Sequence, residues 1–254
     1  MNDPRKIAAF FDIDGTLVPS GSLEWRFVLY LLSRKELRAR NIGRWLLQGI
    51  RLQRVIEPNK YYLAGLPVSL AADWADSIAF EHSNRNGGFI SPDGLDRIAW
   101  HQSRDHRVFL VSGTLAPLAT AVANFLPGKL EVVATELAAS APPSSKHRGA
   151  AIWSGELAGA HMVGAAKLCA VRVLAAKHQL NLNDSYAYGD SVADCAMLEC
   201  VGHPEVVNPS RSMALRARQR GWPVCRWKLV NDIRGEHFSK FGPTEKTAAQ
   251  EQTR

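Results

Sequence analysis

No part of this 254-residue sequence approaches the ~20 consecutive apolar residues that a membrane-spanning helix needs. The opening residues 1–6 are few and polar, and the apolar run after them is interrupted at Asp12, so we expect no secretory signal peptide. The four cysteines have no C-x-x-C spacing, and the eight histidines show no metal-ligand spacing. These absences favour a cytoplasmic protein with reduced thiols, and we assign no role to the histidines.

The composition is that of an ordinary globular protein, with 46% hydrophobic and 22% charged residues. The net charge of +7 is unevenly distributed, because the segment from Ser33 to Tyr61 holds eight Lys or Arg against two Glu. Such a segment can be a solvated surface, a contact with an anionic membrane, or the lining of a pocket for an anionic substrate. No motif of a nucleic-acid reader accompanies it.

The most informative stretch is the apolar run 7–11, which ends in Asp12-Ile13-Asp14-Gly15-Thr16. An unbroken apolar run of this length predicts a strand of a parallel sheet that is covered on both faces. Ligands of open α/β sheets bind where such strands end. Two carboxylates at that position therefore suit a nucleophile or a metal ligand, although a solvated Asp-Gly turn would look the same in isolation.

Three further segments place polar side chains at comparable positions. The apolar run 107–112 ends in Ser112-Gly113-Thr114, and the run 185–188 is followed by Gly189-Asp190-Ser191-Val192-Ala193-Asp194. An amphipathic helix is predicted from Gly164 to His178, with Lys167 in its first turn. The helix dipole disfavours a cation there, so we expect an anionic partner for Lys167 if its side chain is not simply solvated.

The chain between the first two predicted strands is long and helical. From Ser22 to Asn84 the pattern favours several helices and no strand, and such a block is too long for a simple crossover between parallel strands. We therefore expect a helical cap at residues 21–86, inserted after the first strand of an α/β core formed by residues 1–20 and 87–234. A hairpin is expected from strands near 130–137 and 151–153. Residues 235–254 are polar and aperiodic and are expected to be a disordered tail.

Taken together and in this order, these motifs resemble those of the haloacid dehalogenase-like (HAD) phosphohydrolases, in particular the branch that contains phosphoserine phosphatase. The resemblance rests on Asp12-Ile-Asp14-Gly-Thr16, Ser112-Gly-Thr114, Lys167 and Asp190-Ser-Val-Ala-Asp194. It implies an α/β fold with a Rossmann-like parallel-sheet core and a helical cap inserted after the first strand.

The resemblance also implies roles for these residues. Asp12 would be the nucleophile that forms an aspartyl phosphate, and Asp14 would act as general acid and then as general base. Lys167, Ser112 and Gly113 would bind the phosphoryl group. A carboxylic acid that donates a proton near neutral pH needs a raised pKa, which crowding beside other carboxylates can provide.

A cation is needed at such a site, because four Asp side chains and a phosphate would otherwise repel one another. Mg²⁺ is the expected cofactor, since it prefers oxygen ligands and can bridge carboxylate and phosphate. By resemblance its ligands are the Asp12 side chain, the Asp14 backbone carbonyl and the Asp190 carboxylate, with Asp194 either as a ligand or behind the ligands.

These inferences predict a Mg²⁺-dependent phosphatase that acts on a small phosphate monoester. Phosphoserine phosphatase proper is an alternative, but that branch usually has serine at the position of Gly15 and an amine-binding glutamate at the position of Gly21, with Glu24 nearby but offset. An alternative of another class is a non-catalytic basic module that binds nucleic acid or an anionic membrane. The expected partner is a small phosphorylated substrate, with no nucleic acid; peripheral membrane contact and the oligomeric state stay open.

Overall fold

The computed structural model of the chain describes residues 6–19, 21–43, 45, 59–84, 89–128, 130–140 and 151–228. The predicted tail 235–254 lies outside these residues, and so do residues 44 and 46–58 of the basic segment from Ser33 to Tyr61.

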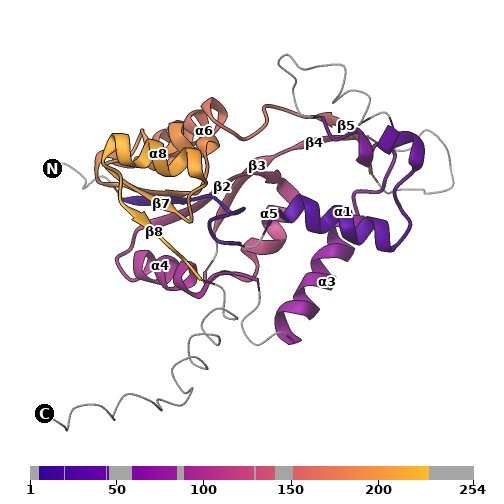
Figure 1. Cartoon of the computed structure of the whole chain (residues 1–254), viewed down its shortest axis with the longest axis horizontal. Helices are drawn as coiled ribbons and strands as arrows, with labels where there is room; N and C mark the ends of the chain where they lie inside the picture. Colours follow the sequence, from indigo (N-terminus) through magenta and orange to yellow (C-terminus); the bar gives the residue numbers. More distant parts are fainter. Residues whose placement is uncertain are drawn as a thin grey trace, which may run out of the picture.

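A six-stranded sheet forms the core, in the order β3-β2-β1-β6-β7-β8 (Figure 1). Every neighbouring pair in this sheet is parallel. The strands are β1 (Ala8–Phe11), β2 (Arg107–Leu115), β3 (Glu131–Thr135), β6 (Tyr186–Gly189), β7 (His203–Val207) and β8 (Val224–Cys225). The predicted parallel α/β core is confirmed, and all four residues of β1 are buried, as its unbroken apolar run requires.

Helices cover both faces of the sheet (Figure 1), and each face has its own buried cluster. Alternate residues of β1 point to opposite faces. Ala9 and Phe11 pack with α4 and α5, whereas Ala8 and Phe10 pack with α6, α7 and α8. The helix bounds are α4 (Pro92–Gln102), α5 (Ala116–Ala123), α6 (Ala165–His178), α7 (Cys195–Leu198) and α8 (Arg211–Arg220).

The chain between β1 and α4 contains helices where the structure describes it, as predicted. It contains α1 (Leu23–Ser33), the short helix η1 (Tyr61–Leu63) and α3 (Leu70–Asn84). We call these three helices the helical unit. The hairpin of β4 (Leu137–Ser140) and β5 (Ile152–Leu157) packs against it, because Trp153 exchanges backbone hydrogen bonds with the loop after η1. Phe27 of α1 contacts both Trp74 of α3 and Trp153 edge to face, with ring centroids 5.8 and 6.1 Å apart.

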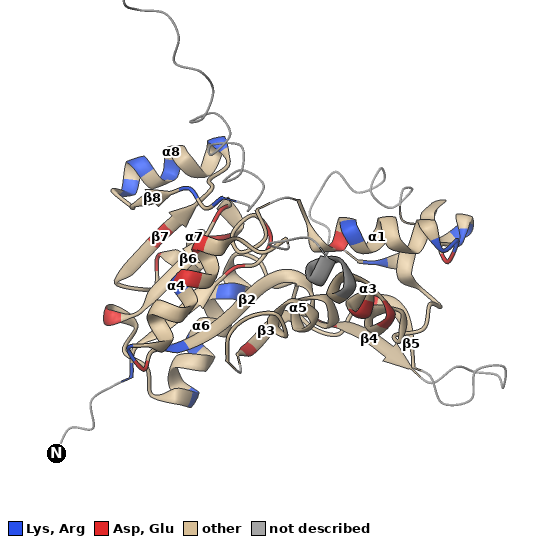
Figure 2. Ribbon diagram, turned by 90° about the horizontal axis from the view of Figure 1, so that it is seen from below, with Lys and Arg blue, Asp and Glu red and all other residues tan. Residues whose placement is uncertain are grey.

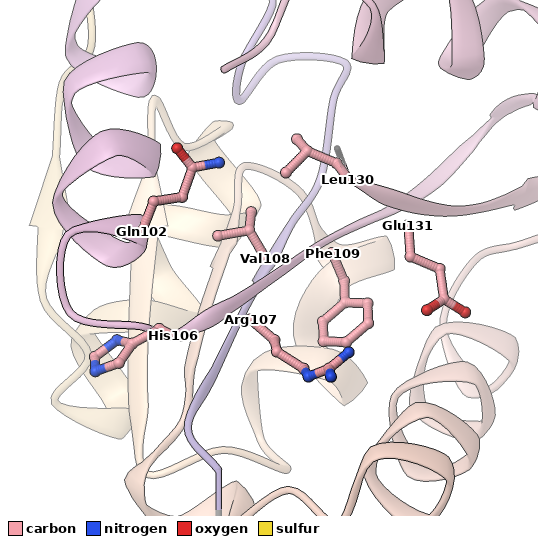
Figure 3. A pocket seen from close by; sticks show the side chains of 7 residues that line it. All are labelled: Gln102, His106, Arg107, Val108, Phe109, Leu130 and Glu131. Atoms are coloured by element: carbon pink, nitrogen blue, oxygen red, sulfur yellow. The ribbon is translucent and has the colours of Figure 1, made fainter. Parts of the chain in front are cut away.

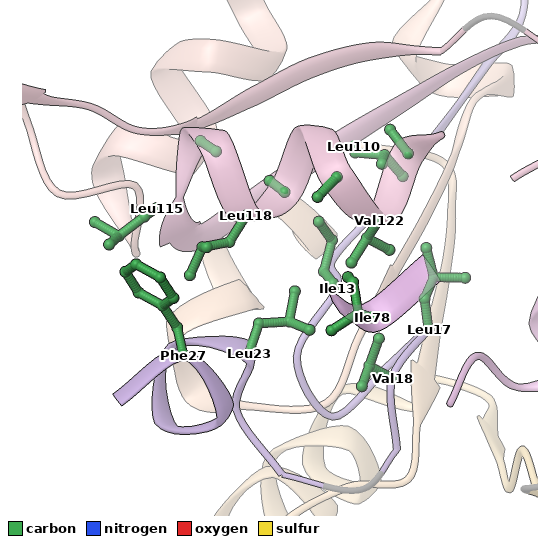
Figure 4. Packing of buried hydrophobic residues seen from close by; sticks show 14 of the residues in the cluster. Ile13, Leu17, Val18, Leu23, Phe27, Ile78, Leu110, Leu115, Leu118 and Val122 are labelled. Carbon is green, nitrogen blue, oxygen red and sulfur yellow. The ribbon is translucent and has the colours of Figure 1, made fainter. Parts of the chain in front are cut away.

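The helical unit and the sheet share one apolar core. Leu23 and Phe27 of α1 lie in the same buried cluster as Leu118 and Val122 of α5 (Figure 4). Ile78 of α3 belongs to the same cluster. A separate cap at residues 21–86 therefore stays a prediction, since this cluster continues from the helical unit into the core.

Several boundaries differ from the expected ones. The strand expected to end at Ser112 continues to Leu115, so Ser112, Gly113 and Thr114 belong to β2, with a shift of register against β3 at this point. The strand expected at 130–137 divides into β3 and β4, because residue 136 turns the chain away from the sheet into the hairpin. β5 extends to Leu157, beyond the expected 151–153, since its further residues pair with β4 and with the loop around η1.

Gly202, between α7 and β7, should be intolerant of a side chain. A Cβ added there would lie 1.7 Å from the backbone oxygen of Asn183, and backbone cannot move aside as a flexible side chain can. Gly202→Ala should lower the free energy of unfolding by about 2 kcal/mol or more, measured by urea denaturation. Gly159→Ala, where an added Cβ meets no atom within 4 Å, is the matched control. Equal stability of the two variants would contradict the packing described here.

Candidate active site

Asp12 follows directly after β1, the strand at which the order of strands in the sheet reverses. β1 lies between β2 and β6, so the chain leaves it toward one side and returns on the other. A crevice at the carboxyl ends of the strands is expected at such a point. The Asp12 backbone N–H donates to the Tyr188 carbonyl at 3.0 Å, which fixes the residue against β6. Its side chain is buried, with a relative exposure of 5% for the residue.

The structure brings three of the four predicted aspartates into one cluster. Asp12, Asp190 and Asp194 each offer a carboxylate oxygen, and these three atoms lie within 4.8 Å of one another. Asp190 follows Gly189 at the end of β6, the strand beside β1. Parallel strands thus deliver their following residues to one edge of the sheet, as the motif order predicted.

Lys167 connects the cluster. Its Nζ donates to Asp12 Oδ1 at 2.6 Å and to Asp194 Oδ1 at 2.5 Å, and the residue is 2% exposed. Burial alone would lower the pKa of Lys167, but the charges of Asp12 and Asp194 outweigh it and raise the pKa. Lys167 is therefore a buried cation with two anionic partners rather than a solvated lysine. Anionic partners are what a lysine in the first turn of a helix such as α6 needs, because the helix dipole disfavours a cation there.

Asp194 is fixed on both oxygens. Oδ1 accepts from Lys167, and Oδ2 accepts from the backbone N–H and the hydroxyl of Ser191, at 3.0 and 2.8 Å. These contacts form a capping box at the start of the short helix η4 (Val192–Asp194). These contacts favour a role in which Asp194 does not bind the metal itself but positions Lys167 and the loop that carries Asp190.

Two glycines allow the acidic segments to approach so closely. Gly15 has a φ of +83°, and a Cβ on it would lie 2.3 Å from Asp190 Oδ2. A Cβ on Gly189 would lie 2.5 Å from the Cβ of Asp194. A side chain at either position would push Asp190 or Asp194 out of the cluster.

Asp14 is turned toward the helical unit. Its Oδ1 accepts a hydrogen bond from the backbone N–H of Leu23, at the start of α1, at 2.9 Å. Burial raises the pKa of Asp14 to about 6, against the opposing effect of that hydrogen bond, and the charge of Glu24 raises it further. A carboxyl group with such a pKa can hold a proton near neutral pH and release it, as a general acid and base must.

The donor set fits a hard divalent cation. All the clustered donors are carboxylate oxygens, which are the ligands that Mg²⁺ takes. Burial raises the pKa of Asp12, and burial together with the charge of Asp194 raises the pKa of Asp190 to about 7. Burial is the larger cause of both shifts, and a cation bound among these oxygens would favour the ionised carboxylates.

Ser112 and Gly113 lie on β2, next to β1. Ser112 is buried, and its Oγ accepts from the Thr114 backbone N–H at 3.3 Å. A residue that the sequence did not single out holds this part of β2 in place. Thr135, at the end of β3, donates from its hydroxyl to the Gly113 carbonyl at 2.7 Å. The only signal in the sequence was a polar residue within the strand expected at 130–137.

A second set of polar residues, most of them from the helical unit, lies near Asp14. Glu24 accepts from Lys60 Nζ at 2.6 Å and from the Tyr62 hydroxyl at 2.5 Å. His161, before α6, faces the same region: its Nε2 lies 3.9 Å from a Cβ built on Gly113, and burial and then the charge of Lys60 lower its pKa. The sequence marked Glu24 only as offset and gave the histidines no role, because nothing local links residues 24, 60, 62 and 161.

A hollow of about 560 Å³ lies at the other end of the sheet (Figure 3). His106, Arg107 and Glu131 line it, at the amino-terminal ends of β2 and β3. The acidic cluster lies at the carboxyl ends, so this hollow is not part of the site.

Comparisons with known proteins agree with this geometry. The model of the family described as haloacid dehalogenase-like hydrolase matches residues 9–199. A probable phosphatase of Mycobacterium tuberculosis is 29% identical over 242 residues, which cover 91% of this chain and 79% of the relative. A phosphoserine phosphatase of the same organism is 30% identical over 235 residues, covering 88% of this chain and 71% of the relative.

Among solved structures, a protein of unknown function from Bordetella pertussis Tohama I has the same fold. It superimposes with a TM-score of 0.67 at 24% identity, over 86% of this chain and 97% of the other. The family match spans the first strand, Lys167 and both acidic motifs, the same residues that the structure gathers at one edge of the sheet. This chain belongs to the haloacid dehalogenase-like hydrolase family.

Proposed function

We propose that the chain is a Mg²⁺-dependent phosphatase that hydrolyses a small phosphate monoester through an aspartyl phosphate on Asp12. One observation carries the proposal: Asp12 ends the central strand with one carboxylate oxygen held by the buried Lys167 and lies within the carboxylate cluster. Membership of a hydrolase family and relatives named as phosphatases support the reaction class. A binding module without catalysis has no need of a buried cluster of acids, so the basic-module alternative is not favoured.

The residues divide the work into two displacements. In the first, an Asp12 oxygen bonds to phosphorus, the bond between phosphorus and the ester oxygen breaks, and Asp14 gives its proton to the leaving alcohol. In the second, water bonds to phosphorus, Asp14 takes a proton from that water, and the bond from Asp12 to phosphorus breaks. Lys167, the Ser112 hydroxyl and the Gly113 backbone N–H stabilise the negative charge on the phosphoryl oxygens.

Asp12, the Asp14 carbonyl and Asp190 would hold the Mg²⁺ ion, and Asp194 would orient Lys167 and the Asp190 loop. When bound, the ion supplies positive charge that lets phosphate and carboxylates share one site. Asp194 as a direct ligand stays a prediction; its two oxygens already accept hydrogen bonds from Lys167 and Ser191.

The leaving alcohol should face the polar group formed by Glu24, Lys60, Tyr62 and His161. In that group Glu24 is paired with Lys60, so its charge is already balanced. An ammonium group of a substrate would have to compete with Lys60 for Glu24. The residue at the position of the family's amine-binding glutamate is Gly21, which has no side chain to offer. These contacts favour a phosphate ester other than phosphoserine.

Asp12→Asn should lower kcat by at least about a thousandfold, because an amide is a poor nucleophile toward phosphorus. The measurement is steady-state hydrolysis of a generic phosphate ester. Asp96→Asn, an exposed position on α4, is the control and should leave kcat unchanged. Substantial turnover by Asp12→Asn, with deamidation back to Asp excluded by mass spectrometry, would refute the nucleophile.

Mg²⁺ should raise the Tm of the protein, and a chelator should stop hydrolysis. At about a hundred times its Kd the ion should stabilise the fold by about 2.7 kcal/mol. Asp190→Asn should lose most of this shift in Tm, because a ligand is removed, and Asp96→Asn should keep it. Full turnover in excess chelator, or an unchanged shift in Asp190→Asn, would count against a metal site at these residues.

Phosphoserine should not be a preferred substrate. A site built to pair with an amine rejects a substrate without one by about 10⁴-fold or more, so true phosphoserine phosphatase activity would be obvious. We expect kcat/KM for phosphoserine to be no higher than for glycerol 3-phosphate, whose leaving group is uncharged and of similar size. A strong preference for phosphoserine that Glu24→Gln abolishes would establish the alternative function.

A further inference from the structure

Helix α1 presents an apolar stripe to solvent. Trp25, Leu29 and Leu32 have relative exposures of 59%, 47% and 46%. Spaced by four and three residues, they share one face of the helix. The opposite face, with Phe27 and Leu31, is buried in the core. A helix that is apolar on both sides therefore has one face that no described part of the chain covers.

No other described element has such a stripe. The remaining large apolar side chains that are exposed in the described residues stand apart from one another: Val173 on α6, Leu215 on α8, Val192, Val224 and Trp45. Single exposed apolar residues are ordinary on a protein surface, whereas a contiguous set marks a contact surface. Trp45 lies on the same side of the helical unit as Glu24, because its ring packs on Tyr62 with centroids 5.6 Å apart.

The charges beside the stripe are almost all positive. Arg34, Lys35, Arg38 and Arg40 follow α1 directly, and all four are exposed; the acid among them is Glu36. Figure 2 shows blue ribbon at the end of α1 that lies away from the sheet. An apolar helix face with tryptophan and a basic flank matches the headgroup region of a bilayer that contains anionic lipid.

The same features argue against a second copy of the chain as the occupant. A symmetric dimer through this stripe would place two basic flanks near each other, and like charges at an interface cost free energy. Three side chains also fall well short of the ~800 Å² per partner that a stable protein interface buries. The surface of an anionic bilayer, in contrast, can bury the apolar side chains and attract the basic residues beside them.

We propose that α1 docks this protein on the surface of a bilayer containing anionic lipids, through Trp25, Leu29 and Leu32 and the adjacent arginines and lysine. The contact is peripheral: within the part of the chain that the structure describes, no helix is long and apolar enough to span a membrane. Docking would place the active site close to the lipid surface, since the first residue of α1, Leu23, is hydrogen-bonded to Asp14. This inference goes beyond the proposed function, and it stands or falls independently of the chemistry at Asp12.

The test is co-sedimentation of the full chain with vesicles of phosphatidylcholine alone and of phosphatidylcholine with about one third phosphatidylglycerol. The protein should bind the anionic vesicles at least about tenfold more strongly than the neutral ones, and added salt should weaken the binding. Leu29→Ser combined with Leu32→Ser should lower the partition coefficient by about tenfold or more. Arg34→Glu combined with Arg40→Glu should have a similar effect.

Matched controls come from the other side of the molecule. Val173→Ser with Leu215→Ser removes two apolar side chains that are at least as exposed as Leu29 and Leu32, with exposures of 60% and 58%. Arg211→Glu with Arg218→Glu makes the same change of net charge on α8, which Figure 2 shows as a second basic helix. Both control pairs should bind vesicles as the parent does. Hydrolysis of a generic ester in solution should stay unchanged in all four variants, which also verifies their folding.

Three results would overturn the proposal. The first is no preference of the parent protein for anionic vesicles. The second is an equal loss of binding in the α8 controls, which would mean that net charge alone acts. The third is a concentration-dependent dimer in sedimentation velocity that Leu29→Ser with Leu32→Ser dissociates, because the stripe would then be a contact between copies.

Discussion

The two ion pairs of Lys167 are the contacts on which the site depends. A lysine with almost no exposure is bound to Asp12 on one side and to Asp194 on the other. Loss of one partner from a buried pair costs about 3–5 kcal/mol, because a charge is left without compensation. Asp194 is in turn held by Ser191, and Gly15 and Gly189 provide the room for these segments to meet. The Asp12 carboxylate is thus held in place by contacts within the chain itself.

The same crowding is the reason why we propose a cation at this site. One lysine cannot balance Asp12, Asp190 and Asp194, and burial makes the remaining negative charge costly, as the raised pKa of Asp190 shows. A divalent ion and a phosphate can complete this balance. The helical unit reaches the site through Leu23, which donates to Asp14, and through Glu24 with its partners. One helix therefore contacts the site at its first residue, Leu23, and carries the exposed apolar stripe on its outer face.

The parts of this arrangement that are local in sequence could be predicted. An apolar run that ends in Asp12 fixes a buried strand, and the order of the motifs placed Asp190 and Lys167 near it. The ends of the strands were less predictable: β2 passes through Ser112 to Leu115, since pairing with β3 decides where this strand ends. Contacts between distant residues, such as Glu24 with Lys60 and Thr135 with Gly113, leave no periodic pattern and emerged only from the fold.

The central claim is that Asp12 itself carries the phosphoryl group during turnover. Reduction with borohydride during steady-state hydrolysis tests it most directly, because an acyl phosphate is reduced to an alcohol whereas a free carboxylate is not. The account predicts that peptide mass spectrometry finds homoserine at position 12, only when substrate and Mg²⁺ are both present. An unmodified Asp12 together with a reduced residue elsewhere, or no reduction at all while the enzyme turns over, would contradict it.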